Sequence, residues 1–275
     1  MRPFAWEMIL HWVAVAGYVA ATHLLAYATL FNKPARVRWA WWMTAFGLVP
    51  HASALAVRYF AVGHGPYMLK YEVLSSNAWI VIAMMLVFVW RRPNWAAIAL
   101  VVLPASIVMM GFGLFSSPEA RDLPPTLRSV WLVVHVVFNY LAVGAFILSL
   151  GSAVCLLRKR NGISGRWLDR LPGPDVLAAQ TIRFVGLGLV LWSTMVVTGA
   201  IWANQAWGRY WGWDPMEIWS LATWLCYAAL IHAHLFFRLK ASAIAWGTIG
   251  CFVISVLTVF IFPFMIPTLH SAYFQ

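Results

Sequence analysis

The chain has 275 residues, of which 63% are hydrophobic and only 10% are charged. A soluble globular domain carries roughly 45–50% apolar and about 25% charged residues, so the composition excludes an ordinary water-soluble enzyme. The formal net charge is +11, but the basic residues fall in short clusters between long apolar runs, which argues against a nucleic-acid-binding surface. The three cysteines lie singly inside apolar runs and form no CxxC pair, so we expect small, buried side chains.

Eight stretches are long and apolar enough to cross a bilayer, which takes about 20 residues of helix. The first stretch is too long for a cleavable signal peptide and is followed by no small-residue cleavage site. The sequence therefore predicts an all-α polytopic membrane protein, a single membrane domain over residues 1–275. In chain order the predicted spans are 8–30, 39–60, 74–90, 95–115, 130–157, 182–204, 216–237 and 241–263.

The distribution of basic residues predicts the orientation, because Lys and Arg in short loops mark the cytoplasmic side. Most of the 19 Lys and Arg residues fall in one alternate set of loops, the largest of which is 158–181. This asymmetry predicts that both termini lie on the outer, periplasmic side. Segments 61–73, 116–129 and 205–215 are expected on the same side.

Histidine is the titratable residue that enters the predicted spans, and ionisable groups within spans are functional candidates. No Ser-His-Asp or HExxH pattern and no chain of buried carboxylates accompany the histidines, which argues against a membrane protease and a proton pump. Neutral imidazole in an apolar, aromatic setting is a ligand for haem iron. The eight histidines are His11, His23, His51, His64, His135, His232, His234 and His270.

Several histidines also have an ordinary structural interpretation. His64 lies in a Gly-His-Gly-Pro loop typical of a solvated turn, and His11 lies near the outer boundary, where it can form interfacial hydrogen bonds. His51 follows a proline and can satisfy the carbonyl that a proline kink frees. His135, about five residues inside the fifth span, and His270, after the last span, are both expected near the outer surface.

The outer segment between the sixth and seventh spans is unusually aromatic, with five tryptophans and a tyrosine between residues 202 and 219. Tryptophan collects in belts at membrane interfaces, but flat indoles with interleaved glycines also suit a large planar ligand, and composition leaves both interpretations open. Asp214 and Glu217 have the spacing of a capping box that opens the seventh helix, so their predicted role is structural. The outward helix N-terminus and Arg209 favour anionic groups such as porphyrin propionates.

The segment 207–219 reads Trp-Gly-x-x-Trp-x-Trp-Asp-Pro-x-Glu-x-Trp and is continued by Thr-Trp-Leu-x-Tyr at 223–227 and by His232. This pattern resembles the WWD signature of the cytochrome c assembly proteins. Eight spans and a histidine inside the seventh are more similar to the CcsA/ResC-like members of system II cytochrome c biogenesis than to the smaller CcmC. The resemblance covers residues 127–275, a haem-handling region, whereas the four predicted helices of 1–125 carry no signature.

The resemblance implies a set of haem-binding residues. Two external histidines flank the WWD segment in the family and ligate haem iron; they correspond here to His135 and His270. A histidine in the helix after the motif is associated with a second, intramembrane haem and corresponds to His232. Met216 and His234 depart from the family, which often has Lys and Arg there, and neither touches the proposed ligands. The predicted platform beside the outer haem consists of Trp207, Arg209, Tyr210, Trp211 and Trp213.

His23 is the predicted partner of His232 at the intramembrane position. Both predicted helices run from outside to inside, with His232 about 16 and His23 about 15 residues from the start. At roughly 1.5 Å per residue the two imidazoles would lie at nearly the same depth. The alternatives are His51 and a residue from another protein.

By resemblance, we expect the protein to carry haem b across the bilayer and to present it to an apocytochrome c with a Cys-x-x-Cys-His segment. It would act within a cytochrome c haem lyase (holocytochrome c synthase) complex with a separate CcsB/ResB-type membrane partner. The expected location is the bacterial cytoplasmic (inner) membrane, or the thylakoid membrane in a plastid. Two alternatives stay open: a haem-binding chaperone or regulator without attachment activity, and a b-type electron-transfer subunit. No nucleic-acid partner is expected.

Overall fold

The computed structural model describes residues 3–116, 122–162 and 170–265, and these residues form helices and connecting loops. Eight helical segments are long and apolar enough to cross a membrane, which confirms the predicted all-α architecture. The long helices are α1 (Pro3–Leu30), α2 (Ala35–Val62), α3 (Lys70–Arg91), α4 (Ala99–Leu114), α5 (Val130–Arg160), α6 (Pro174–Trp207), α7 (Pro215–Phe237) and α8 (Ala241–Val256). Shorter helical elements are η1 (Pro93–Ile98), η2 (Pro125–Leu127), η3 (Leu257–Ile261) and α9 (Phe262–Met265).

The helix ends follow local signals as well as the apolar runs. Helix α6 begins at Pro174 rather than near residue 182, because Gly173 and Pro174 start the helix and Asp175 lies in its positive first turn. The predicted inside loop 158–181 is correspondingly shorter, since α5 also continues to Arg160. A window of apolar residues therefore finds the membrane-crossing part of each helix but not the polar extension.

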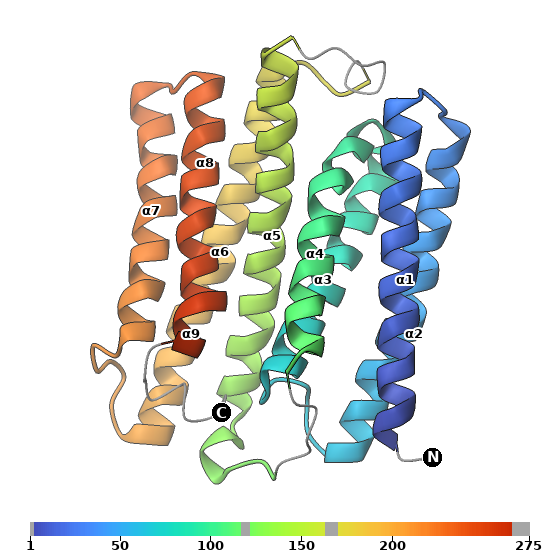
Figure 1. Ribbon diagram of the computed structural model, residues 1–275. Helices are drawn as coiled ribbons and strands as arrows, with labels where there is room; N and C mark the ends of the chain where they lie inside the picture. The colour runs from blue at the N-terminus through green and yellow to red at the C-terminus, as the bar shows by residue number, and fades with distance from the viewer. Residues whose placement is uncertain (1–2, 117–121, 163–169, 266–275) are drawn as a thin grey trace.

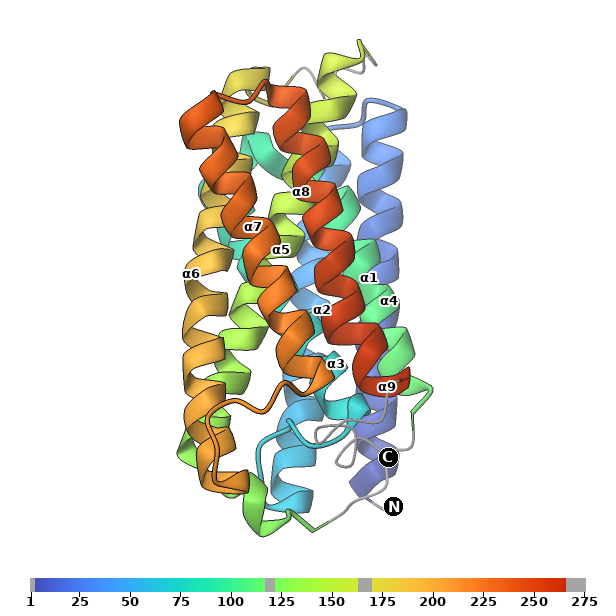
Figure 2. The ribbon, with the colours of Figure 1, turned by 90° about the vertical axis from the view of Figure 1, so that its left-hand side faces the viewer.

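The helices stand side by side in a bundle with three parts (Figure 1). The α1–α2 hairpin forms one edge, α7 and α8 form the opposite edge, and α3, α4, α5 and α6 lie between them. Figure 2 shows the second edge face-on, with α7 and α8 in front of α5 and α6. The loops 63–69, 122–129 and 208–214 lie at one end of the bundle, which is also the end where α1 begins.

Helix α5 is the central element, because 78% of its most apolar window is buried inside the protein. The core beside it is aromatic: the rings of Phe146 and Tyr227 stack with centroids 3.8 Å apart and planes inclined by 5°. Trp192 lies next to Phe146 at 5.9 Å. A Cβ at Gly188 would lie 2.3 Å from Phe146 Cε1, so this glycine allows the ring to fit against α6.

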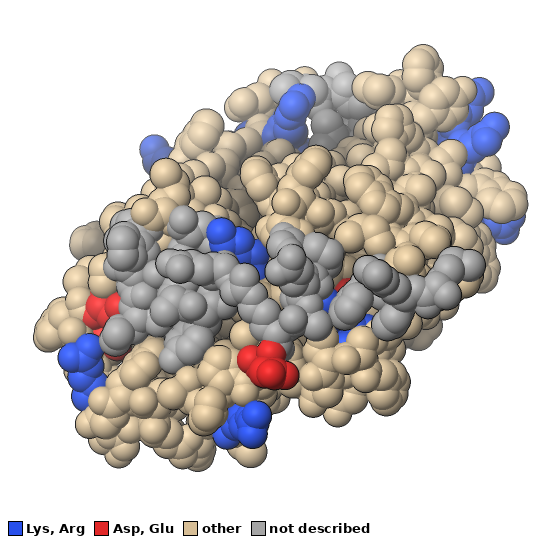
Figure 3. All heavy atoms as spheres, turned by 60° about the horizontal axis from the view of Figure 1, so that its bottom comes forward, with Lys and Arg blue, Asp and Glu red and all other residues tan. Residues whose placement is uncertain are grey.

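Charged side chains are sparse on the surface, as expected for a chain that crosses a membrane. Viewed toward the end that carries the loops 208–214 and 63–69, Lys, Arg, Asp and Glu are scattered and do not gather into one patch (Figure 3). The chain is thus a multi-pass membrane protein. Several of its polar and charged side chains are buried between the helices.

Candidate functional site

A cavity opens at the end of the bundle that carries the segment 207–219, between α3, α5, α6 and α7. Its empty volume is about 1300 Å³, including the part open to solvent. The walls are mainly apolar and aromatic, which suits a large planar ligand. The lining residues used below are Tyr67, Met68, His135, Trp192, Gly199, Trp202, Tyr210, Trp211, Met216 and Glu217.

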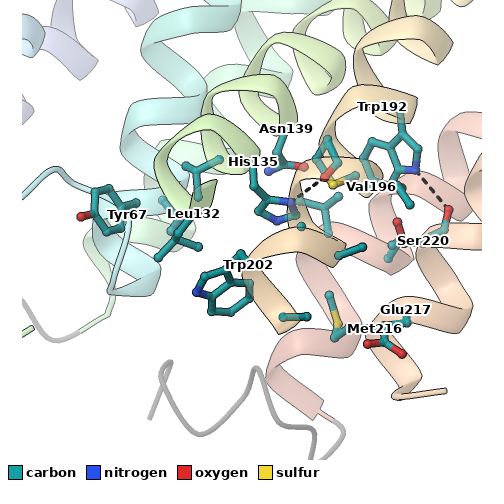
Figure 4. Close-up of a pocket in the computed structure, with 18 of the residues that line it drawn as sticks. Tyr67, Leu132, His135, Asn139, Trp192, Val196, Trp202, Met216, Glu217 and Ser220 are labelled. Carbon is teal, nitrogen blue, oxygen red and sulfur yellow. Dashed lines mark hydrogen bonds between the residues drawn. The ribbon is translucent and has the colours of Figure 1, made fainter. Parts of the chain in front are cut away.

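His135 projects from α5 into this cavity toward α6 (Figure 4). Its Nδ1 lies 2.8 Å from the carbonyl oxygen of Met195. A carbonyl oxygen only accepts hydrogen bonds, so Nδ1 carries a hydrogen, and the neutral form of this ring has its lone pair on Nε2. A hydrogen bond from one ring nitrogen to a backbone carbonyl is the usual way in which a metal-ligating histidine is oriented. The structure thus gives His135 the kind of support that a metal-ligating histidine has, and its predicted role as a haem ligand stays a prediction.

Two residues of α6 hold the His135 imidazole in place. A Cβ at Gly199 would lie 2.5 Å from Nδ1 of His135, so only glycine allows this approach. The indole of Trp202 stacks on the imidazole with centroids 6.3 Å apart and planes inclined by 29°. The Trp202 Nε1–H in turn donates to the carbonyl of Thr126 at 2.9 Å, which fixes the indole. Trp202 belongs to the aromatic segment noted in the sequence, but the sequence did not predict that Gly199 and Trp202 contact His135.

The predicted aromatic platform is only partly assembled at the cavity. Tyr210 and Trp211 line it, whereas Trp207 and Trp213 are not among its lining residues. Trp207 packs edge-on against Trp202 at 4.9 Å and so supports the wall from behind. Trp213 is 66% exposed and touches the edge of Trp211 at 5.8 Å. One face of the segment thus faces the cavity while the other faces outward.

Arg209 lies on the solvent-exposed side of the turn that precedes α7. A Cβ at Gly212 would lie 2.4 Å from the Arg209 guanidinium carbon, so the guanidinium folds back over the backbone at Gly212. Arg209 is not among the residues that line the cavity. Its predicted interaction with an anionic ligand stays a prediction.

Asp214 and Glu217 form a capping box at the start of α7, as their spacing predicts. Asp214 Oδ1 accepts the N–H of Met216 at 2.9 Å, and Glu217 Oε2 accepts the N–H groups of Asp214 at 3.1 Å and of Gly212 at 2.7 Å. Trp213 lies between Gly212 and Asp214 and has a φ of +58°, a conformation that non-glycine residues seldom adopt. The two carboxylates thus hold the aromatic turn in place beside the cavity.

The opposite wall of the cavity comes from the 63–69 loop, which the sequence did not associate with the site. Tyr67 and Met68 line the cavity, and the Tyr140 hydroxyl of α5 donates to the carbonyl of Pro66 at 3.3 Å. Burial raises the pKa of the Tyr67 phenol, and the nearby Glu72 carboxylate and Tyr59 raise it further. Tyr67 is therefore a neutral hydroxyl on this wall at ordinary pH.

The structure does not bring the predicted intramembrane pair together. His232 lies on the exposed side of α7, where it stacks on Phe236 with centroids 4.3 Å apart. His23 lies on the exposed side of α1, and its Nδ1 lies 2.8 Å from the carbonyl of Val19. Helices α1 and α7 stand at opposite edges of the bundle (Figure 1). Equal depth along two helices says nothing about lateral distance, so His23 does not meet His232 within one chain. His270 lies outside the described residues.

Three other histidines are buried, including His11, which was expected at the outer boundary, and His64, which was expected in a solvated loop. His64 is 8% exposed and its Nδ1 lies 2.8 Å from the carbonyl of Gly65, so it is not a solvated turn residue. His11 and His51 are both fully buried. The His11 ring bonds to Ser75 of α3 and to the backbone carbonyl of Glu7, and the His51 ring bonds to Tyr18 of α1 and to Ser75.

The comparisons with known proteins show the family to which the chain belongs. A family model described as cytochrome C assembly protein matches residues 67–270. The chain belongs to this family. The match begins before α3, so it includes the loop wall with Tyr67 and Met68 as well as the aromatic turn.

Individual relatives are named cytochrome c biogenesis protein CcsA. The protein of Prochlorococcus marinus (strain MIT 9312) is 34% identical over 208 residues, which covers 66% of this chain and 67% of the relative. The protein of Chlamydomonas reinhardtii is 33% identical over 190 residues, covering 66% of this chain and 53% of the relative. A solved structure, cytochrome c haem lyase CcmF, has a TM-score of 0.73 at 16% identity. It covers 95% of this chain, which spans about half (47%) of that protein. This likeness is one of fold.

Proposed function

We propose that the cavity binds haem at the outer surface of the membrane and presents it to an apocytochrome c for covalent attachment. The single observation that carries the proposal is the His135 imidazole, which lines an aromatic cavity and is held at Nδ1 by the Met195 carbonyl and by close contact with Gly199. Family membership and the names of the relatives support a role in cytochrome c biogenesis. The lining residues fit the ligand, because indole and phenol rings offer stacking faces while the walls are otherwise apolar.

The chemistry asks the protein for positioning more than for acid–base catalysis. Haem b supplies two vinyl groups, and each thioether forms when a cysteine thiol adds across one of them, sulfur to one vinyl carbon and hydrogen to the other. His135 and His270 would hold the iron as axial ligands. Trp211 and Tyr210 would fix the plane, so that each vinyl meets one thiol of a Cys-x-x-Cys-His segment.

The exposed His232 supports the second part of the proposal, a partner membrane protein on the face of α7. An imidazole that faces lipid without a polar partner group is energetically unfavourable. Only 17% of the most apolar window of α7 is buried inside the protein. A CcsB/ResB-type protein seated there would cover His232 and could supply the second axial ligand of an intramembrane haem.

The ligand assignment is tested with His135→Gly and His270→Gly in the purified protein. Each variant is expected to lose haem absorption, and added imidazole should restore part of it by occupying the vacated position. His23→Gly is the matched control, because His23 lies on the far edge of the bundle and should leave the spectrum unchanged. Unchanged spectra and unchanged cytochrome assembly in both ligand variants would refute the assignment.

Attachment activity is tested by co-expression with a CcsB-type partner and an apocytochrome c. Covalent haem on the apocytochrome, dependent on His135, is the expected result. Haem bound to this chain with no covalent product would favour a chaperone or regulator. Tightly retained haem that cycles reversibly between oxidation states without any dependence on apocytochrome would favour an electron-transfer subunit.

A further inference from the structure

Three buried ionisable side chains lie together between α1, α2 and α3. Glu7, Arg58 and Glu72 are each 1% exposed, although each lies at or beside the end of a predicted span. Ionised groups at this degree of burial are costly unless they are paired, and ionisable groups within membrane spans are functional candidates. The role of this cluster therefore depends on which of the three side chains are ionised and how they are paired.

The Arg58 guanidinium forms its short ion pair with Glu72, one of the two carboxylates. Arg58 Nε donates to Glu72 Oε1 at 2.8 Å, while Glu72 Oε2 accepts the N–H groups of Met68 at 2.8 Å and Leu69 at 3.1 Å. Arg58 Nη1 is 3.8 Å from Glu7 Oε2, and among the described residues neither carboxyl oxygen of Glu7 has a hydrogen-bond partner. One guanidinium thus balances Glu72, and the Glu7 carboxyl needs a further positive charge or a proton.

A row of hydrogen-bonding side chains begins beside Glu7 and runs along α1. His11 Nε2 lies 2.7 Å from Ser75 Oγ, and His51 Nε2 lies 2.9 Å from the same oxygen. The Tyr18 hydroxyl lies 3.1 Å from His51 Nδ1 and ends the row. At the other end, His11 Nδ1 lies 3.0 Å from the backbone carbonyl of Glu7. The Tyr71 hydroxyl also lies within hydrogen-bond distance of this nitrogen.

The donors in this row can be ordered completely with His11 neutral. His11 Nδ1 carries a hydrogen, because the Glu7 carbonyl only accepts, and the Tyr71 hydroxyl oxygen then accepts from the same N–H. His11 Nε2 then accepts from the Ser75 hydroxyl, Ser75 accepts from His51 Nε2–H, and His51 Nδ1 accepts from the Tyr18 hydroxyl. In this order the Glu7 carboxyl is protonated. The only ionised groups of the cluster are then Arg58 and Glu72, whose charges cancel.

The same row can also be ordered in the opposite direction. With one proton on His11 Nε2 and none on the Glu7 carboxyl, the imidazolium donates to Ser75 and Ser75 donates to His51 Nε2. His51 is then in its other tautomer, and its Nδ1–H donates to the Tyr18 oxygen. Each hydrogen bond keeps one donor and one acceptor, and the new Glu7 carboxylate is balanced by His11. We propose that Glu7 and His11 form a proton-binding site that holds one exchangeable proton, with Ser75, His51 and Tyr18 accommodating either position.

The charged and titratable groups that face this pair come from two neighbouring helices. Arg58 and His51 face it from α2, and Glu72 and Tyr71 face it from α3. Glu72 also holds the backbone of the 63–69 loop, whose Met68 lines the cavity. Loss or gain of the proton therefore changes the charge beside one wall of the cavity, whatever ligand the cavity takes.

Infrared and NMR spectra of the full chain in lipid nanodiscs test this site without any ligand. With ¹³C-labelled glutamate and ¹⁵N-labelled histidine, the wild type at neutral pH should show either the C=O band of one protonated glutamic acid or the nitrogen signals of one imidazolium. Glu7→Gln should abolish that signal. Glu72→Gln should abolish a carboxyl band as well, because Arg58 is then available to balance an ionised Glu7. Glu217→Gln is the control and should change neither signal.

The proposal is overturned if the wild type shows neither signal, or if the signal persists unchanged in Glu7→Gln. The first of these outcomes needs no variant, so the test stands even where Glu7→Gln fails to fold. Raising the pH of the wild-type sample should remove the signal in one step that corresponds to one proton. Loss of two or more protons in that step would also refute a single shared proton.

Discussion

Replacing Gly199 by alanine tests whether the close approach of α6 to the His135 imidazole controls haem binding. The new Cβ would lie 2.5 Å from Nδ1 and 2.8 Å from Cε1 of His135, whereas ordinary contacts begin at 3.4 Å. The ring must therefore move by about 1 Å, more than the hydrogen bond to Met195 can absorb. Losing the group that orients a ligating histidine typically weakens metal binding 10–100-fold, and we expect a loss in this range.

The assay is a titration of the purified variant with haem, followed by absorption. Alanine is a better helix former than glycine, so α6 should be retained and the loss should not reflect unfolding. Gly186→Ala is the matched control on the same helix, because its Cβ would meet only Ile231 Cδ1 at 4.0 Å. Wild-type affinity in Gly199→Ala, or an equal loss in Gly186→Ala, would refute the reasoning.

Three further outcomes are expected. Trp211→Ala should weaken haem binding more than Trp213→Ala, because Trp211 lines the cavity and Trp213 is largely exposed; equal effects in a haem titration would contradict this. Asp214→Ala should lower stability by about 1 kcal/mol through loss of the helix cap, measured by thermal unfolding in detergent, with the fold retained. His232→Ala, purified with a partner membrane protein, should lose haem from the intramembrane site while His23→Ala keeps it; haem loss in His23→Ala would show that the exposed face of α1 also takes part.

The membrane spans could be predicted from the sequence because each needs a long apolar run, and such runs are hard to mistake. The polar first turns of α6 could not, since residues 174–181 are helical through local start signals and not through hydrophobicity. The capping box of Asp214 and Glu217 could be read directly, because both partners lie within four residues of each other. Local patterns thus predicted what local forces determine.

Features that depend on which helices become neighbours could not be predicted. Gly199 and His135 are far apart in the chain, so nothing in either segment indicates that they touch. The pairing of His23 with His232 used depth alone and omitted the position of each helix around the bundle. The Arg58–Glu72 pair joins α2 to α3 and was hidden because each residue, taken singly, looks like a charge at the end of a span.

The closely packed rings of Phe146, Tyr227 and Trp192 have a consequence for how haem could reach the cavity. They are at most 1% exposed, and Trp192 also lines the inner end of the cavity, where its Nε1–H donates to the Ser220 carbonyl at 3.1 Å. These rings plug the interior of the bundle, and a porphyrin could not pass through them without separating α5, α6 and α7. A haem that starts on the cytoplasmic side would therefore travel along the outside of the bundle. The face of α7 that carries His232 offers an imidazole on that route.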